Sequence, residues 1–160
     1  MTLALGIDPG TATTGYGLVR LAPDGGLVAV KYGVILTSKD ATAPARLVTL
    51  YDQLRTLIHE HHPEVAAVEK LFFSRNVTTA LAVGQARGVI MLCLDQAGIA
   101  AFEYTPNEIK QAVAGYGGAQ KRQVQEMVRA LLALDSIPKP DDAADALAIA
   151  ITHLSTRRYD

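Results

Sequence analysis

Four carboxylate side chains in this sequence occupy positions from which they could act together. Asp8 ends the apolar run TLALGID, and Glu69 lies late in a second apolar run, EVAAVEKLFF. Asp142 and Asp145 are three residues apart in PDDAADALAIA, so they share one face if this segment is a helix. We expect both to fall in the first turn of that helix, where the helix dipole favours negative charge.

These four side chains, if they converge, have the composition of a metal site. Carboxylates that share a pocket repel one another, which shifts their pKa values unless cations join them. Oxygen ligands without histidine or cysteine suit Mg²⁺ or Mn²⁺, and two such ions ~4 Å apart can clamp the attacking and leaving oxygens in phosphodiester hydrolysis. Taken singly, each aspartate also fits a strand-ending turn or a helix cap, and spacing alone leaves the convergence open.

The elements that must position these residues alternate between strands and helices along most of the chain. Apolar runs predict strands at residues 2–8, 16–22, 27–36, 64–73 and 98–104. Helices are predicted at residues 45–62, 77–97, 106–114, 119–134 and 141–157. The turn residues Pro23 to Gly26 join the second and third strands as a hairpin. The sequence therefore predicts an α/β fold with a five-stranded mixed sheet flanked by helices.

The convergence of the carboxylates depends on how the first and fourth strands pair. Sites in open sheets gather at the carboxyl ends of parallel strands. If these two strands are parallel neighbours, Asp8 and Glu69 lie side by side at that end. The apolar turns that follow Asp145 would pack on the sheet and direct the two later aspartates towards the same end.

Length and composition place the chain among single-domain globular proteins. It has 160 residues, of which 49% are hydrophobic and 19% charged. The one cysteine, Cys93, favours a reducing cytoplasm. No run approaches the ~20 apolar residues of a membrane span, so we expect no contact with a membrane. The formal net charge of −1 gives no nucleic-acid signal, so such a surface would have to be a local basic patch.

Two smaller motifs have more than one interpretation. The histidines of HEHH, residues 59–62, fit the end of a helix, where imidazoles suit the dipole, better than a metal site. Gly84 and Gly88 are four residues apart on a predicted helix, which indicates close approach of another backbone. That backbone belongs either to the protein's own sheet or to a second copy of the chain.

Five segments together resemble the RuvC family of Holliday-junction resolvases. They are GIDPGTATTGYG, VEKLFFSRN, VGQARGVI, YTPNEIKQAVAGYGGAQKRQVQEMV and DDAADALAIAITH, in order from Leu5 to about His153. The resemblance implies a ribonuclease H-like fold over residues 1–160 and a homodimer that makes paired, symmetric nicks in four-way junction DNA. It also implies two Mg²⁺ ions per active site, with Mn²⁺ as a substitute, and work alongside the branch-migration proteins RuvA and RuvB.

The resemblance assigns roles to individual residues. Its metal-binding and catalytic positions match Asp8, Glu69, Asp142 and Asp145. The family pattern DAADALA begins at the second aspartate of the pair, which leaves Asp141 as a cap or an outer neighbour. Some members carry histidine in place of Asp142. The DNA-binding positions expected here are Phe72, Arg75, Lys110, Lys121 and Arg122.

Two of these assignments rest on local features as well. One of Phe72 and Phe73 should point outwards at the strand end, and we expect Phe72 to stack on a base. Between residues 70 and 122 basic side chains outnumber acidic ones, as contact with a phosphate backbone requires. The glycines of GYGGAQKR predict a flexible loop that holds Lys121 and Arg122 towards DNA.

Other functions remain open on the sequence. The segment GIDPGTATTG also resembles the first phosphate loop of actin-like ATPases and sugar kinases, although the chain has no room for their second lobe. A ribonuclease H that cuts RNA–DNA hybrids would use the same metal chemistry. A non-catalytic junction-binding protein is disfavoured because all of the acidic positions are filled.

Overall fold

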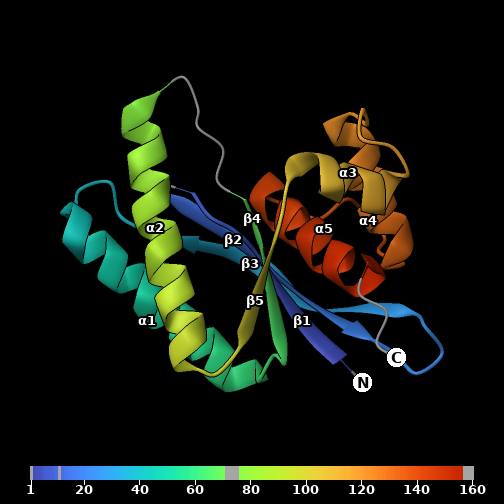
Figure 1. Ribbon diagram of the computed structural model, residues 1–160, viewed down its shortest axis with the longest axis horizontal. Coiled ribbons are helices and arrows are strands. Elements are labelled where there is room, and N and C mark those ends of the chain that lie inside the picture. The colour runs from blue at the N-terminus through green and yellow to red at the C-terminus, as the bar shows by residue number, and fades with distance from the viewer. Residues whose placement is uncertain (1, 11, 71–75, 157–160) are drawn as a thin grey trace.

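The computed structural model describes residues 2–10, 12–70 and 76–156. Its strands are β1 (Thr2–Asp8), β2 (Thr13–Leu21), β3 (Leu27–Leu36), β4 (Val65–Glu69) and β5 (Ala100–Tyr104). Its helices are α1 (Ala43–His61), α2 (Val77–Gln96), α3 (Pro106–Ala114), α4 (Lys121–Leu131) and α5 (Asp141–Thr156). The predicted α/β arrangement of five strands and five helices is thus confirmed (Figure 1).

The strands form one mixed sheet in the order β3-β2-β1-β4-β5. The first three strands are antiparallel neighbours, and β1, β4 and β5 run parallel to one another. The hairpin predicted at Pro23 to Gly26 is present, closed by a hydrogen bond of 2.8 Å from the Ala22 N–H to the Gly26 carbonyl oxygen. The central strand β1 therefore has a parallel neighbour on one side only.

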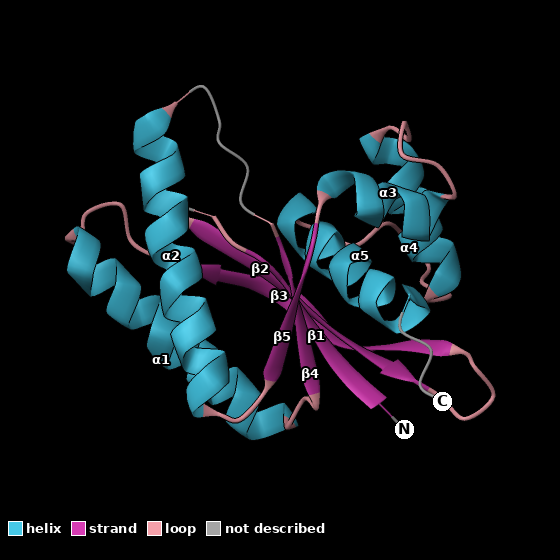
Figure 2. Cartoon of the chain, viewed as in Figure 1, coloured by secondary structure: helices cyan, strands magenta, loops and turns pink. Residues whose placement is uncertain are grey.

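The sheet lies between two groups of helices, with α1 and α2 on one face and α3, α4 and α5 on the other (Figure 2). Successive side chains of β1 point to opposite faces of the sheet, as in any β-strand. Leu5 and Ile7 belong to the core beneath α1 and α2. Ala4 belongs to the core beneath α5, the helix in which almost every residue from Ala143 to Leu154 is buried.

Local signals explain where several helices begin and end. Thr105 and Glu108 form a reciprocal capping box at the start of α3, and Gly115 ends that helix with a φ of 89°. The α1 helix ends at His61, and His62 follows as its C-cap in the left-handed conformation, so the histidine motif ends a helix as expected.

Several predicted bounds and placements differ from the structure. β2 begins at Thr13, three residues earlier than expected, because Thr13 and Thr14 pair with the far end of β3. β4 ends at Glu69. Lys121 and Arg122 open helix α4 rather than lying in a glycine-rich loop. Asp142 lies in the first turn of α5, whereas Asp145 lies beyond it.

Helix α2 is long and apolar enough to cross a membrane by length and composition, with a mean hydropathy of 1.6 over an 18-residue window. The sequence-based expectation that no segment approaches this limit was therefore wrong. One such helix is weak evidence for a span, because helices that pack inside other proteins pass the same test. Only 22% of the apolar window is buried here; Ala86, Ile90, Cys93 and Leu94 are the buried residues of α2, and they pack in the core beneath α1 and α2.

Candidate metal centre

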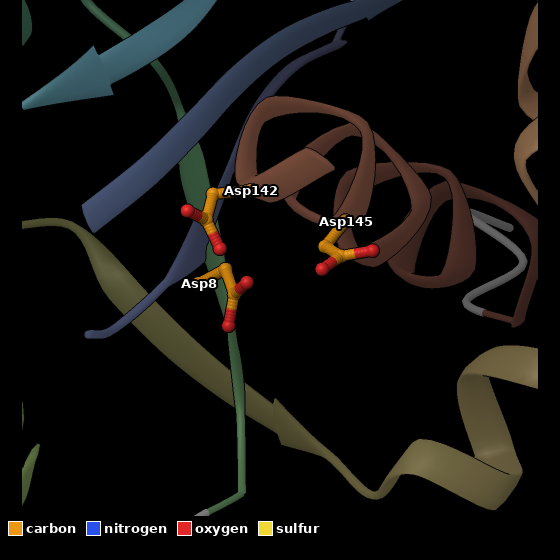
Figure 3. A group of neighbouring side chains, drawn as sticks. All are labelled: Asp8, Asp142 and Asp145. Atoms are coloured by element: carbon orange, nitrogen blue, oxygen red, sulfur yellow. The ribbon is translucent and has the colours of Figure 1, made fainter. Parts of the chain in front are cut away.

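Asp8, Asp142 and Asp145 converge at one end of the sheet. Asp8 is the last residue of β1, and the other two project from successive turns of α5 (Figure 3). Each offers one carboxylate oxygen, and these oxygens all lie within 4.8 Å of one another. Three partly buried carboxylates at this spacing form a donor set for a divalent cation.

Close packing of α5 on the sheet produces this convergence. Two glycines, Gly6 of β1 and Gly15 of β2, lie where α5 crosses these strands. A Cβ atom at Gly6 would clash with the carbonyl oxygen of Ala146, and one at Gly15 would clash with that of Asp142. Because the helix backbone lies directly on the strands, its acidic first turns reach the end of β1.

Glu69 joins the site from the neighbouring strand. β1 and β4 are parallel, and Ile7 lies opposite Val68. The next residues of the two strands, Asp8 and Glu69, therefore lie side by side. The Glu69 carboxyl is close enough to Asp8 to raise the pKa of that side chain. The condition on which the sequence-based convergence depended, parallel pairing of these strands, is therefore met.

The electrostatics of the cluster favour neutralisation. Burial, followed by the charge and hydrogen bond of Glu69 and the charges of Asp145 and Asp142, raises the pKa of Asp8 to about 9. Burial also raises the pKa of Asp145, although the Lys121 ammonium opposes this effect. The carboxylates repel one another when all of them are ionised. The cluster is therefore stabilised when it binds protons or cations.

Lys121 and Asp141 lie at the rim of the cluster. Lys121 Nζ is 3.2 Å from Asp141 Oδ2 and 3.9 Å from Asp145 Oδ2. Gln125 donates a hydrogen bond of 3.3 Å to the other oxygen of Asp141. Asp141 thus contacts α4, whereas Asp142 lies in the cluster with Asp8.

A pocket of about 290 Å³ opens beside the carboxylates, between α3, α4 and α5. Glu69 and Asp145 line one part of it, and Lys110 and Lys121 contribute positive charge. Its remaining wall consists of Pro106, Ile109, Val124, Ala148 and Ile149. Acidic and basic groups thus meet in one concave surface, as the binding of a metal together with a phosphate requires.

The other expected DNA-binding residues are placed differently or fall outside the described residues. Arg122 lies on the exposed side of α4, where its guanidinium is 3.3 Å from Glu126. Phe72 and Arg75, like Phe73, belong to residues 71–75, which lie outside the described part of the chain.

Sequence reasoning missed a structural contact made by Arg87. This residue counted only as part of the basic excess, yet its guanidinium forms an ion pair with Glu103 and donates a hydrogen bond of 3.2 Å to the Glu69 carbonyl oxygen. The available signal was an arginine in the middle of an apolar helix, because buried arginines are almost always paired.

Comparison with known proteins adds two kinds of finding. The family described as "Crossover junction endodeoxyribonuclease RuvC" matches residues 4–153. A protein of that name from Roseiflexus sp. (strain RS-1) is 58% identical over 152 residues, which cover 95% of this chain and 90% of the relative. Another, from Chloroflexus aggregans, is 59% identical over 154 residues and 93% of its length.

A solved structure is similar over nearly the whole chain. The structure of T. thermophilus RuvC in complex with a Holliday junction substrate superposes with a TM-score of 0.92 and 36% sequence identity. The superposition covers 97% of this chain and 94% of the other. The order of strands and the helices that flank them are therefore shared between the two proteins.

Proposed function

Because this chain belongs to the RuvC family of crossover junction endodeoxyribonucleases, with a ribonuclease H-like fold, we propose that it resolves four-way (Holliday) DNA junctions by paired, symmetric nicks. The observation that carries the proposal is the convergence of acidic side chains from β1, β4 and α5 in a chain that matches the family from residue 4 to residue 153. The whole of residues 1–160 acts as one nuclease domain in this proposal.

The proposed metal ligands are Asp8, Glu69, Asp142 and Asp145. The donor set fits a hard divalent cation, because it is built from carboxylate oxygens and the pKa of Asp8 is raised to about 9 in the metal-free site. We propose Mg²⁺ as the natural ion and Mn²⁺ as a substitute, with two ions per site. Bound there, the ions supply Lewis acidity for the attacking water and for the leaving 3′ oxygen.

The protein's own groups orient this reaction. In the metal-free site Asp8 retains a proton up to about pH 9, and the neutralised carboxyl limits repulsion from Glu69. Lys121, paired with Asp145 at 3.9 Å, lies where a phosphate can replace that carboxylate as its partner. Lys110 lines the same pocket and can contact a second phosphate oxygen.

The wider DNA surface in this proposal extends from the pocket along α4. Lys110 and Lys121 contact the strand that is cut, and Arg122 contacts the backbone further along the exposed side of that helix. Phe72 stacks on a base at the crossover, and Arg75 binds a nearby phosphate. The role of Phe72 rests on the family resemblance and its place at a predicted strand end, and that of Arg75 on the excess of basic residues between residues 70 and 122.

A homodimer completes the proposal, because a four-way junction has two-fold symmetry and needs two active sites. Exposed apolar residues on one side of α2 support it: Val77 and Leu81 are 68% and 66% exposed, and Leu92 is 53% exposed. A Cβ atom at Gly88, on the same helix, would meet no atom within 4 Å. The helix thus presents an open apolar stripe to a second copy.

The cellular setting follows from the substrate. Resolution of junctions belongs to recombination and repair of DNA, and we place the enzyme in the cytoplasm beside the branch-migration proteins RuvA and RuvB. The cysteine Cys93 is buried and free, as is usual in a reducing compartment.

One experiment tests the central proposal. The protein and its Asp8→Asn variant are incubated with a four-way junction, a linear duplex and an RNA–DNA hybrid, with and without Mg²⁺. Asp24→Asn, in the exposed turn between β2 and β3, is the matched control. We expect the wild type and the control to nick the junction symmetrically only with Mg²⁺, and the Asp8→Asn variant to bind the junction without cutting it.

Two outcomes would contradict the proposal. Cleavage of the hybrid but not the junction would identify a ribonuclease H. Undiminished cleavage by the Asp8→Asn variant would remove Asp8 from the metal site.

A further inference from the structure

Arg87 brings a partly buried positive charge into the middle of helix α2. Its side chain is only 13% exposed, and the surrounding helix is among the most apolar segments of the chain. A guanidinium in such a place costs free energy unless its donors are satisfied. The groups that pair with the Arg87 guanidinium therefore indicate the role of this residue.

The two ends of the guanidinium bind two different strands. Nη2 forms an ion pair with the Glu103 carboxylate of β5, and Nη1 donates to the main-chain carbonyl oxygen of Glu69, 3.2 Å away at the end of β4. Just beyond, the Lys70 N–H donates a hydrogen bond of 2.8 Å to the Tyr104 carbonyl oxygen. The peptide group that joins Glu69 to Lys70 is thus held at both its carbonyl oxygen and its N–H.

We propose that Arg87 is a positioning residue for the metal centre, acting through the main chain of Glu69. With the carbonyl of Glu69 fixed, its side chain is held beside Asp8, its neighbour at the end of the parallel strands β1 and β4. Glu103 neutralises the guanidinium and keeps it in the orientation that reaches the carbonyl. This inference rests on the proposed function, because it assumes that Glu69 is a metal ligand.

The shape of the arginine side chain is essential to this role. A planar guanidinium can donate to two acceptors in fixed directions at once, whereas a lysine ammonium is a compact charge on a flexible stem. Arg87→Lys retains the charge and can keep the pair with Glu103, but cannot hold both strands in the same geometry. This variant therefore separates positioning from simple charge neutralisation.

The chain offers a matched control in Arg129. Its guanidinium also forms an ion pair, 3.1 Å from Glu126, and also donates to a main-chain carbonyl, that of Leu134 at 3.4 Å. These contacts lie within α4 and the turn that follows it, and none of them involves the proposed ligands. Arg129→Lys thus imposes the same chemical change away from the centre.

The test uses the full-length protein and three measurements. Mn²⁺ binding to the metal-free protein is measured by calorimetry, amide hydrogen exchange is measured at residues 65–70, and the Mn²⁺ dependence of junction cleavage is recorded. We expect Arg87→Lys to weaken Mn²⁺ binding roughly 10-fold, within the range for residues that support metal ligands. Exchange at the end of β4 should be faster without metal, and the cleavage rate should recover substantially at high Mn²⁺.

Arg129→Lys should leave Mn²⁺ affinity and exchange at residues 65–70 unchanged. A second variant, Glu103→Gln, retains an oxygen acceptor for the guanidinium and should give a smaller loss of Mn²⁺ affinity than Arg87→Lys. The proposal is overturned if Arg87→Lys binds Mn²⁺ as the wild type does, or if it lowers the melting temperature with no change in affinity or in exchange.

Failure of the proposed function has a different signature. In that case the wild-type protein itself would bind Mn²⁺ no better than Asp8→Asn, and the inference about Arg87 would fall with it. If instead the wild type binds Mn²⁺ in an Asp8-dependent manner and Arg87→Lys matches it, only the inference about Arg87 is wrong.

Discussion

The main chain of Asp142 lies directly on Gly15, with no room for a side chain between them. Gly15 of β2 is paired with Asp8 of β1. Gly15 therefore lies opposite one proposed ligand, Asp8, and in contact with the main chain of another, Asp142. The geometry of the acidic cluster thus depends on the absence of a side chain at Gly15.

Substitution of this glycine should damage both stability and metal binding. Gly15→Ala forces the start of α5 away from the sheet, at a cost of roughly 1–3 kcal/mol or more in the free energy of unfolding. We expect weaker Mn²⁺ binding together with a lower melting temperature. Gly117→Ala is the control, because the nearest atoms to a Cβ there are 4.0 Å away. Equal effects of the two substitutions would contradict this prediction.

The raised pKa of Asp8 predicts how the stability of the metal-free protein depends on pH. Its pKa is about 9 in the folded chain and 3.8 ordinarily, so between these values the folded state binds more protons than the unfolded state. The free energy of unfolding contributed by Asp8 therefore falls as the pH rises through this window.

Asp8→Asn should remove this contribution, since asparagine does not ionise. At pH 8 in EDTA the variant should melt higher than the wild type by ~2–4 °C for each 1 kcal/mol of relieved repulsion. Added Mg²⁺ should raise the melting temperature of the wild type but not that of the variant. Thermal unfolding from pH 5 to pH 8 measures both effects, with Asp24→Asn expected to follow the wild type.

The adjacent aspartates of α5 should differ sharply on substitution. Asp142→Asn removes a proposed ligand and should reduce cleavage by more than the ~100-fold that changes around metal ligands reach. Asp141→Asn breaks an exposed pair with Lys121, worth ~0.2–1 kcal/mol, and should reduce cleavage by less than ~5-fold. Single-turnover cleavage rates measure both, and an inverted order would show that Asp141 is the ligand.

A charge on the exposed stripe of α2 should separate the proposed dimer. Leu81→Glu places a carboxylate where a second copy is expected to pack, so sedimentation should show monomers. Val28→Glu, on the edge strand β3 and 48% exposed, should remain dimeric. If the Leu81→Glu protein stays dimeric, the interface lies elsewhere.

Elements with local signals could be predicted closely from the sequence. The bounds of α3 agree with the predicted 106–114, and Thr105, Pro106 and Gly115 mark its ends in the structure. The prediction for α4 was less accurate. The start of this helix is capped by the Gln123 side chain, which accepts a hydrogen bond from the Gln120 N–H. Glutamine is not a common N-cap residue, so the sequence carries no clear signal there. The bounds predicted for this helix, 119–134, contain Lys121 and Arg122, so the separate expectation that these two residues lie in a loop was wrong.

The candidate site was predictable in composition but not in its supports. Asp8 and Glu69 end apolar runs, and Asp142 and Asp145 share a helical face, which are properties of the sequence itself. The role of Arg87 depends on which strands lie beside α2, and the need for Gly15 depends on how close α5 lies to the sheet. Both arise from contacts between residues that are distant in sequence, which no local pattern contains.

Helix α5 supplies two of the four proposed ligands and covers β1 and β2, although it is the last described element along the chain. During synthesis β1 leaves the ribosome more than a hundred residues before α5 does. A nascent chain that ends before residue 141 has half of the acidic cluster and lacks the helix that sits on Gly15. In the proposed mechanism the metal centre is therefore complete only after the final helix has docked on the sheet.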